Sequence, residues 1–176
     1  MLAGEKVVLR AAEPADAERV QRWLSDVERV WFGPDVPVPS RGAVEKWLTR
    51  LGGGMERGTR LWSIDTQDGR HVGLVRLSEA EGPHRRARLD VMVGQPEFQG
   101  RGLESDALSV ALRQAFRHLN LNRVEGRVPA SRPDLVEAYK QAGLVEEARL
   151  SRALFVGGQY VDEVVLAALA PGRQAS

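Results

Sequence analysis

Residues 99–104, with the sequence QGRGLE, are the stretch of this chain best suited to hold a charged ligand. The two glycines predict a tight turn, and the apolar spacing over 103–116 predicts that a helix begins directly after it. Free backbone N–H groups and the positive end of the helix dipole meet at such a turn, so it attracts anions. Arg101 adds a positive charge suited to a phosphate. The segment therefore predicts a site for a phosphate-bearing cofactor, and a turn of purely structural purpose is the alternative.

Glu104 complicates this interpretation, because it places a carboxylate where the anionic ligand would lie. A carboxylate in contact with a phosphate is repelled by on the order of several kcal/mol at an effective dielectric constant of about 20. The side chain avoids that repulsion if it points away from the ligand, towards Arg101. Either orientation makes Glu104 the residue that most directly tests the site.

The elements that must position this turn are short apolar strands and amphipathic helices. Apolar runs and alternation predict about seven strands, and apolar residues at helical spacing predict about four helices. The predicted strands cover 6–10, 60–64, 71–77, 87–93, 122–128, 150–156 and 161–169, and the predicted helices begin near residues 14, 44, 103 and 133. A chain of 176 residues with this pattern predicts one α/β (α+β) domain over 1–176, with a flexible tail from about residue 171.

Composition excludes several classes of protein. Hydrophobic residues make up 43% and charged residues 28% of the chain, which is typical of a globular domain. No apolar run reaches the roughly 18 residues that span a bilayer, so we expect no membrane partner and a cytoplasmic location. The net charge of +1 gives no reason to expect nucleic acid. The absence of cysteine excludes disulfides and thiolate ligands, and we predict no metal site.

Several segments, read in order along nearly the whole chain, resemble the GNAT superfamily of N-acetyltransferases. Within it the resemblance is to the branch of ribosomal-protein N-terminal and spermidine acetyltransferases. The segments are VLR at 8–10 with Asp16, WFG at 31–33, PEFQGRG at 96–102, LNRV at 121–124, AYKQAGL at 138–144 and ALFVGGQYVD at 153–162. The resemblance implies the GNAT fold, a central twisted mixed sheet flanked by helices, and acetyl-CoA as the co-substrate.

The resemblance also implies where an acetyl group would be transferred. Strands 87–93 and 122–128 would splay apart, and the pantetheine arm would lie between them. The implied cofactor-binding residues are Met92, Val93 and Gly94 for the pantetheine, and Gln99, Gly100, Arg101, Gly102, Leu103 and Glu104 for the diphosphate. Tyr139 matches the family's tyrosine, which protonates the departing thiolate after an amine attacks the thioester. Taken alone, a helical tyrosine is more typical of a core residue.

Three positions depart from the family pattern. Glu104 stands where the family usually has Gly or Ala, Arg132 where it usually has Asn, and Arg88 where many relatives carry the glutamate that deprotonates the amine. Asp90, two residues further on the same face of the strand, is the nearest substitute for that base. An exposed aspartate paired to Arg86 or Arg88 is the alternative.

Arg132 also has two interpretations. It either contacts the phosphates of the cofactor, or it begins the helix that follows, where Ser131 and Asp134 form a pair resembling a capping box. The first interpretation adds Arg132 to the cofactor-binding residues, and the second gives it no part in the reaction.

The acceptor of the acetyl group stays open at this stage. Residues of the expected acceptor side are Trp31, Phe32, Asp35, Trp62, Glu79 and Glu81, although such aromatics more often belong to the core. The acidic residues favour a cationic amine, whereas the basic run 84–86 favours an acidic one. We therefore predict transfer to a primary amine of a small molecule or of a protein N-terminus, and a homodimer stays open. The alternative is a GNAT-fold binding or regulatory module impaired by Glu104, Arg132 and Arg88.

Overall fold

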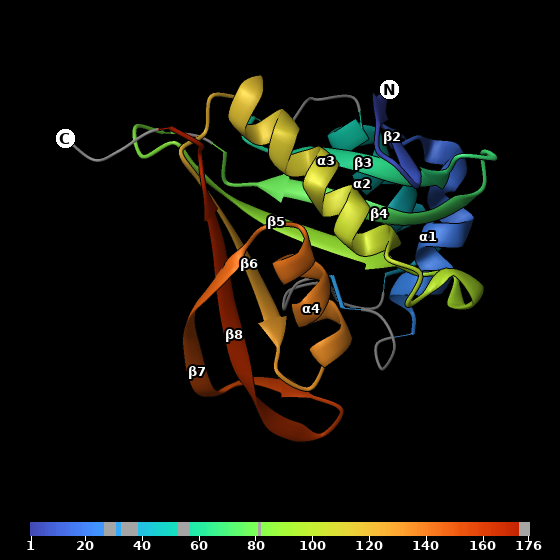
Figure 1. Ribbon diagram of the computed structural model, residues 1–176. Coiled ribbons are helices and arrows are strands. Elements are labelled where there is room, and N and C mark those ends of the chain that lie inside the picture. The colour runs from blue at the N-terminus through green and yellow to red at the C-terminus, as the bar shows by residue number, and fades with distance from the viewer. Residues whose placement is uncertain (27–30, 33–38, 53–56, 81, 173–176) are drawn as a thin grey trace.

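The computed structural model describes residues 1–26, 31–32, 39–52, 57–80 and 82–172. Its centre is an eight-stranded sheet in the order β1-β2-β3-β4-β5-β6-β8-β7 (Figure 1). The strands are β1 (Leu2–Ala3), β2 (Val7–Ala11), β3 (Arg60–Thr66), β4 (His71–Ser78), β5 (Arg86–Val93), β6 (Arg123–Pro129), β7 (Val145–Val156) and β8 (Gln159–Leu169). The helices are α1 (Ala17–Leu24), α2 (Arg41–Gly52), α3 (Leu103–Arg117) and α4 (Pro133–Gln141), with 3-10 turns at Pro14–Asp16 and Pro96–Phe98.

The predicted fold class and the predicted helices are confirmed, and the strand count is one too low. The additional strand is β1, whose two residues pair with Leu9 and Val8 of β2 and are too short to leave a pattern in the sequence. The strand predicted from residue 150 begins earlier in the structure, at Val145. The sequence pattern misses these first residues because this end of β7 is largely exposed and carries polar side chains. The tail expected from about residue 171 lies outside the described residues from position 173 onward.

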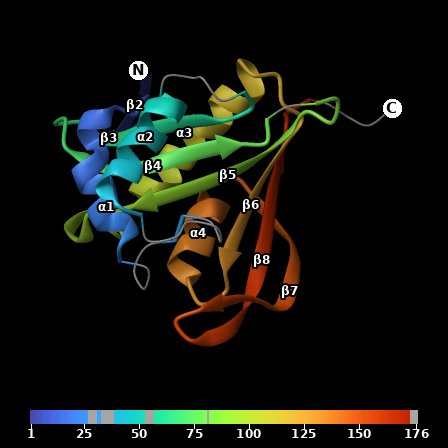
Figure 2. The ribbon, with the colours of Figure 1, turned by 180° about the vertical axis from the view of Figure 1, so that it is seen from behind.

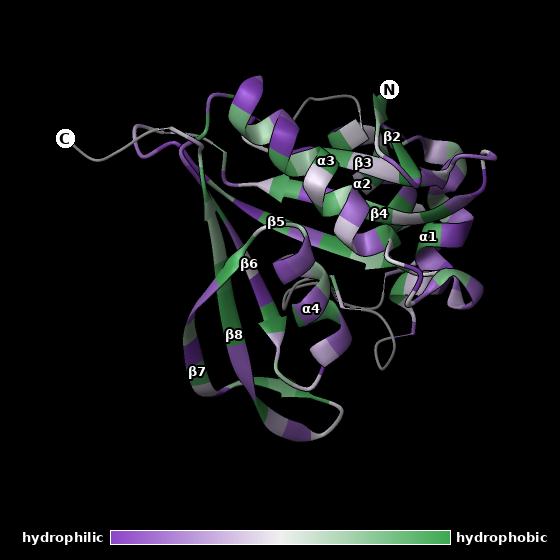
Figure 3. Ribbon diagram, viewed as in Figure 1, coloured by the Kyte–Doolittle hydropathy of each residue, from purple (hydrophilic) through white to green (hydrophobic). Residues whose placement is uncertain are grey.

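The helices cover both faces of the sheet, so the chain has two hydrophobic cores. One core lies under α3 and α4, and a smaller one lies under α1 and α2 (Figures 1 and 2). Helix α3 is amphipathic (Figure 3): Leu103, Ala107, Ala111 and other apolar residues are buried, whereas Arg117 is not. Within the described residues, no helix is both long and apolar enough to cross a membrane.

The sheet opens between β5 and β6. These two strands run parallel and pair only at Arg86 with Arg123, Ala87 with Val124, and Arg88 with Glu125. Strand β5 stays paired to β4 as far as Val93, and β6 stays paired to β8 as far as Pro129, so the two strands diverge (Figure 2). The predicted splay is therefore present, and it begins directly after Arg88.

A buried ion-pair network attaches the start of α1 to the sheet. The guanidinium of Arg10 on β2 binds both carboxylate oxygens of Asp16 at 2.8 Å, and the hydroxyl of Ser63 donates to the same carboxylate at 2.8 Å. His71 Nδ1 lies 3.3 Å from Asp16 Oδ1. Although burial alone would raise the pKa of Asp16, these donors and charges, Arg10 foremost, hold it well below its usual value. Asp16 is thus a buried anion that depends on its partners.

Candidate active site

The glycine turn places the start of α3 at the edge of the opening. Gly100 and Gly102 have φ of 71° and 76°, a left-handed conformation that side-chain-bearing residues rarely adopt. Gly102 is the residue from which α3 begins, and the N–H of Asp106 donates to its carbonyl at 3.3 Å. The N–H groups of residues 103–105 therefore precede the helical ladder, as an anion site requires. This confirms the predicted strand-to-helix geometry.

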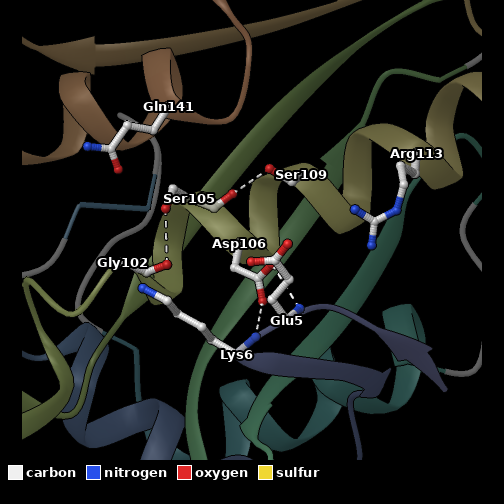
Figure 4. Close-up of a pocket in the computed structure, with 8 residues that line it drawn as sticks. All are labelled: Glu5, Lys6, Gly102, Ser105, Asp106, Ser109, Arg113 and Gln141. Atoms are coloured by element: carbon white, nitrogen blue, oxygen red, sulfur yellow. Dashed lines mark hydrogen bonds between the residues drawn. The ribbon is translucent and has the colours of Figure 1, made fainter.

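A cavity of about 320 Å³ lies beside this turn, on the side of α3 that faces the N-terminal strands (Figure 4). Its lining residues are Glu5, Lys6, Gly102, Ser105, Asp106, Ser109, Arg113 and Gln141. The ammonium of Lys6 donates to the carbonyl of Arg101 at 3.0 Å, so the N-terminal segment supports the turn directly. Sequence reasoning missed Lys6, because nothing in the sequence indicates that it lies beside a residue 95 positions away.

The end of β5 lies next to the same turn. The side-chain amide of Gln99 donates to the carbonyl of Val93 at 3.0 Å, which connects the turn to the strand. Met92 and Val93 are buried, and the N–H of Gly94 donates to Val72 at 3.0 Å. A side chain on Gly94 would overlap the ring of Trp23, so close packing requires glycine here. The predicted pantetheine contacts and the predicted phosphate turn are thus adjacent.

Tyr139 lies where β5 and β6 diverge. Its side chain is 1% exposed, and its hydroxyl donates to the carbonyl of Leu89 at 2.8 Å. The ring packs on Gly126 of β6, where an added Cβ would lie 2.1 Å from a ring carbon. Burial, and after it the charge of Asp90, raises the pKa of Tyr139 well above its usual value. The phenol is therefore protonated at neutral pH and can donate a proton inside the opening.

Glu104 is the second residue of α3, and among the described residues no ion pair joins it to Arg101 as the sequence suggests. Burial raises the pKa of Glu104, its own backbone N–H lowers it, and the charges of Asp134 and Arg132 act on it as well. Arg101 instead lies over the ring of Phe98, with its guanidinium carbon 5.4 Å from the ring centroid. Glu104 thus keeps its carboxylate close to the helix start that an anionic ligand would use.

Arg132 takes the position that begins α4. It is the residue before Pro133, and its guanidinium binds both oxygens of Asp134 at 3.0 and 2.7 Å. The capping-box pair expected between Ser131 and Asp134 is wrong, because no side chain caps this helix and the Asp134 carboxylate is engaged by Arg132. The two residues place an ion pair beside Glu104.

Asp90 is buried rather than exposed, with 2% of its surface accessible. Arg76 Nη2 lies 2.6 Å from Asp90 Oδ2, and Arg88 Nε lies 3.3 Å from Oδ1. The partnership with Arg88 is the one the sequence suggested, whereas Arg76 was missed and Arg86 takes no part. Each oxygen of the carboxylate therefore already accepts a hydrogen bond from an arginine.

The residues expected on the acceptor side have mixed positions. Trp31 donates from its indole N–H to the carbonyl of Arg127 on β6 at 3.2 Å, and buried Phe32 packs against Arg76. Trp62 packs against the core under α3, and Glu79 is exposed just beyond β4. Asp35 and Glu81 lie outside the described residues. The structure therefore supports Trp31 and Phe32 as neighbours of the opening.

Comparisons with known proteins agree with this geometry. The family model for the acetyltransferase (GNAT) domain matches residues 6–145, and the chain belongs to this family. The resemblance and the fold class predicted from the sequence are confirmed, and acetyl-CoA is the co-substrate that acetyltransferases of this family use.

Individual relatives belong to the expected branch. The spermidine N(1)-acetyltransferase of Vibrio cholerae is 35% identical over 91 residues, and that of Escherichia coli K12 is 34% identical over 93 residues. These alignments span about half of this chain and about half of each relative. A putative ribosomal N-acetyltransferase of Bacillus subtilis is 25% identical over 170 residues, covering 91% of this chain and 89% of the relative.

A solved structure extends the likeness over almost the whole chain. The spermidine N-acetyltransferase from Vibrio cholerae, in complex with CoA and spermine, matches with a TM-score of 0.82 and 26% identity. The match covers 93% of this chain and 95% of that one. The fold of this protein is therefore the one on which that relative binds CoA.

Proposed function

We propose that this protein is an acetyl-CoA-dependent N-acetyltransferase that modifies a primary amine of a small molecule. The observation that carries the proposal is the Tyr139 hydroxyl, buried and hydrogen-bonded to Leu89 inside the opening between β5 and β6. The glycine turn beside the end of β5 supplies the backbone N–H groups that the diphosphate of the cofactor requires. The GNAT family, to which the chain belongs, supports the same chemistry.

The proposed reaction is direct attack of the amine on the thioester. The nitrogen lone pair forms a bond to the acetyl carbon, the C–S bond breaks, and the thiolate takes the proton of the Tyr139 phenol. The tyrosinate then recovers a proton, ultimately the one lost by the amine, so the products are the acetamide and CoA. Backbone N–H groups near the end of β5 would stabilise the oxyanion that forms on the way.

Asp90 remains a predicted base for this reaction. Both of its carboxylate oxygens already accept hydrogen bonds from Arg76 and Arg88, which hold the carboxylate in place. Ordered water that carries the amine proton to solvent is the route compatible with those ion pairs. We therefore propose that Asp90 first of all positions the two arginines.

A calorimetric titration with acetyl-CoA tests the proposal. We expect saturable binding, and we expect Gly102→Val to abolish it, because valine would strain the left-handed backbone and contact Lys6. Gly69→Val is the matched control: Gly69 also has a positive φ, but it lies in the β3–β4 hairpin with open space around it. Absence of binding to the unmodified protein at millimolar acetyl-CoA contradicts the proposed function.

The second candidate is a GNAT-fold binding or regulatory module that no longer catalyses transfer. The observation that favours it is the Glu104 carboxylate beside the start of α3, with the Arg132–Asp134 ion pair next to it. A module of this kind would gain acetyl-CoA binding when Glu104 is changed to Gly. The proposed enzyme already binds without that change.

Partners and location are part of the proposal. A protein N-terminus is the alternative acceptor, in line with the putative ribosomal acetyltransferase among the relatives. A homodimer is proposed because β7 is an edge strand and leaves Phe155 and Tyr160 of its hairpin about two-thirds exposed. We propose a cytoplasmic location, without nucleic-acid or membrane partners. Light scattering of the purified protein tests the dimer.

A further inference from the structure

Two arginines and one aspartate form a cluster on the sheet face opposite Tyr139. Arg76 of β4 and Asp90 of β5 are paired in register, and Arg88 lies two residues before Asp90 on the same face of β5. Their neighbours Leu74 and Met92 belong to the core under α1 and α2. The cluster therefore lies on the α1–α2 side of the sheet, whereas Tyr139 approaches from the α4 side.

The cluster has one more positive charge than negative charges. Asp90 accepts from Arg76 at 2.6 Å and from Arg88 at 3.3 Å, and a single carboxylate neutralises only one of the two guanidinium groups. The Arg76 and Arg88 side chains are 20% and 18% exposed, whereas that of Asp90 is 2% exposed. A ligand that enters from the α1–α2 side would thus meet arginine before it meets aspartate.

Arg88 also has an unused hydrogen-bond donor. Its Nη2 is buried and has no hydrogen-bond partner among the described residues. Buried donors in folded proteins are nearly always paired, so an unpaired guanidinium nitrogen indicates a missing partner such as a ligand or water. The planar guanidinium matches a carboxylate, which can accept two parallel hydrogen bonds from it.

The charged groups of the neighbouring strand are balanced among themselves. Glu125 of β6 is in register with Arg88, but its carboxylate lies 2.8 Å from Arg123 and 3.8 Å from Arg127. Glu163 of β8 lies 3.7 Å from Arg127. Neither Glu125 nor Glu163 forms an ion pair with Arg76 or Arg88, so Asp90 is the one acidic residue within 4 Å of these two arginines in the described part of the chain.

The cluster is adjacent to the proposed reaction centre. Leu89, whose carbonyl accepts the Tyr139 hydroxyl, lies between Arg88 and Asp90 in β5. Arg76 connects the cluster to Phe32, a residue expected on the acceptor side. Its guanidinium lies over the Phe32 ring, 5.0 Å from the centroid, and donates to the Phe32 carbonyl at 3.4 Å. An amine that reaches the thioester from this side would carry its other groups past these arginines.

We propose that Arg88, supported by Arg76, binds a carboxylate of the acceptor, so that the substrate is a small primary amine carrying an acid group. The inference rests on the proposed acetyl transfer and names the class of amine that it uses. A polyamine is disfavoured at this site, because its additional ammonium groups would meet the surplus positive charge. Arg88 thus sets specificity at a position where many relatives, by the resemblance, carry a glutamate.

A series of acceptors with matched chains tests the proposal. At saturating acetyl-CoA, kcat/KM is measured from CoA release for ω-amino acids, for diamines of the same chain length and for the corresponding alkylamines, with glutamate and spermidine added. We expect the best amino acid to exceed its matched diamine at least tenfold. In Arg88→Gln that preference should shrink by tenfold or more, mainly through the KM of the amino acid. Arg88→Lys should recover part of it, and Arg86→Gln, a change at an exposed arginine of the same strand, should leave it intact.

Two outcomes overturn the proposal: a preference for diamines or spermidine over the amino acids, or an unchanged preference in Arg88→Gln. A short peptide ending in a free amine, with and without an acidic second residue, separates a protein N-terminus from a free amino acid. Titration of the ω-amino acids into the protein, with and without CoA, gives a readout that does not depend on turnover. If the protein binds the amino acid but not acetyl-CoA, the proposed function fails and the carboxylate site stands; equal binding to wild type and Arg88→Gln removes the site itself.

Discussion

The hydroxyl of Tyr139 lies 2.8 Å from the carbonyl oxygen of Leu89, so a side chain of α4 binds the backbone of β5 across the opening that β6 leaves. The bond holds the phenol at the point where two strands separate. It also gives the buried hydroxyl the hydrogen-bond partner that a buried polar group needs.

Tyr139→Phe removes the hydroxyl and keeps the ring that packs on Gly126. We expect kcat to fall roughly 100-fold or more while KM for acetyl-CoA changes little, because only the proton donor is lost. The loss of one buried hydrogen bond should lower the free energy of unfolding by about 1 kcal/mol. Steady-state kinetics and urea denaturation measure the two effects, and an unchanged kcat removes Tyr139 from the role of acid.

Gly126→Ala should displace Tyr139 from the other side. The added Cβ would lie 2.1 Å from the tyrosine ring, so the ring or β6 must shift. Overpacking of this kind costs about 1–3 kcal/mol of stability, and we expect kcat to fall together with stability because the hydroxyl moves. Gly42→Ala is the control, since that helical glycine has open space around it and should keep full activity. A stable, fully active Gly126→Ala protein would contradict the assigned packing.

Glu104→Gln should strengthen acetyl-CoA binding roughly tenfold, which corresponds to about 1.4 kcal/mol. The neutral amide keeps the size of the side chain and removes its repulsion of the diphosphate. Because burial raises the pKa of Glu104, its carboxylate loses its proton at a higher pH than usual, and wild-type affinity should fall as pH rises through that pKa.

Titration calorimetry between about pH 4.5 and 8 measures this difference. The phosphates of the ligand titrate identically with both proteins, so only the gap between wild type and Glu104→Gln reports Glu104. The gap should be small at the acidic end and should grow as pH rises through the raised pKa of Glu104. Glu97→Gln, an exposed change in the nearby 3-10 turn, should leave affinity unchanged. Equal affinity of wild type and Glu104→Gln at neutral pH would show that the carboxylate does not face the ligand.

Asp16→Asn should destabilise the protein by about 3–5 kcal/mol at neutral pH, because Arg10 loses the partner that binds it through two hydrogen bonds. The pKa of Asp16 is lowered in the folded protein, so its contribution is fully present above the usual pKa near 4 and is lost as pH falls below it. Thermal or urea unfolding from pH 7 to 2 should therefore show a steeper acid loss for wild type than for Asp16→Asn. Glu45→Gln, at an exposed position of α2, should behave as wild type. Parallel pH profiles for wild type and Asp16→Asn would contradict the assignment.

The helices and the interior strands are predictable from the sequence because their buried faces impose a regular apolar spacing. The early part of β7 is not, since an exposed edge strand imposes none. The glycine turn is predictable for a related reason: its positive φ angles require the residue type that the sequence shows.

The parts of the site that depend on strand register escape prediction. Arg76 and Asp90 are fourteen positions apart, and only the pairing of β4 with β5 brings them together. The orientation of Glu104 depends likewise on where α4 begins relative to α3. Local sequence contains the chemistry of each residue, and the tertiary arrangement decides which charge it meets.

The three residue pairs that join β5 to β6 also bear on the stiffness of the sheet. Strands β1 to β5 form one part of the sheet, and β6 to β8 form the other. Beyond Arg88 the backbone of β5 has no strand on its β6 side within the described residues. A pantetheine arm has two amide groups, so it would fit beside β5 in place of a strand and connect the two parts of the sheet. Bound acetyl-CoA would therefore hold the two parts of the sheet together, and the protein should be stiffer with acetyl-CoA than without it.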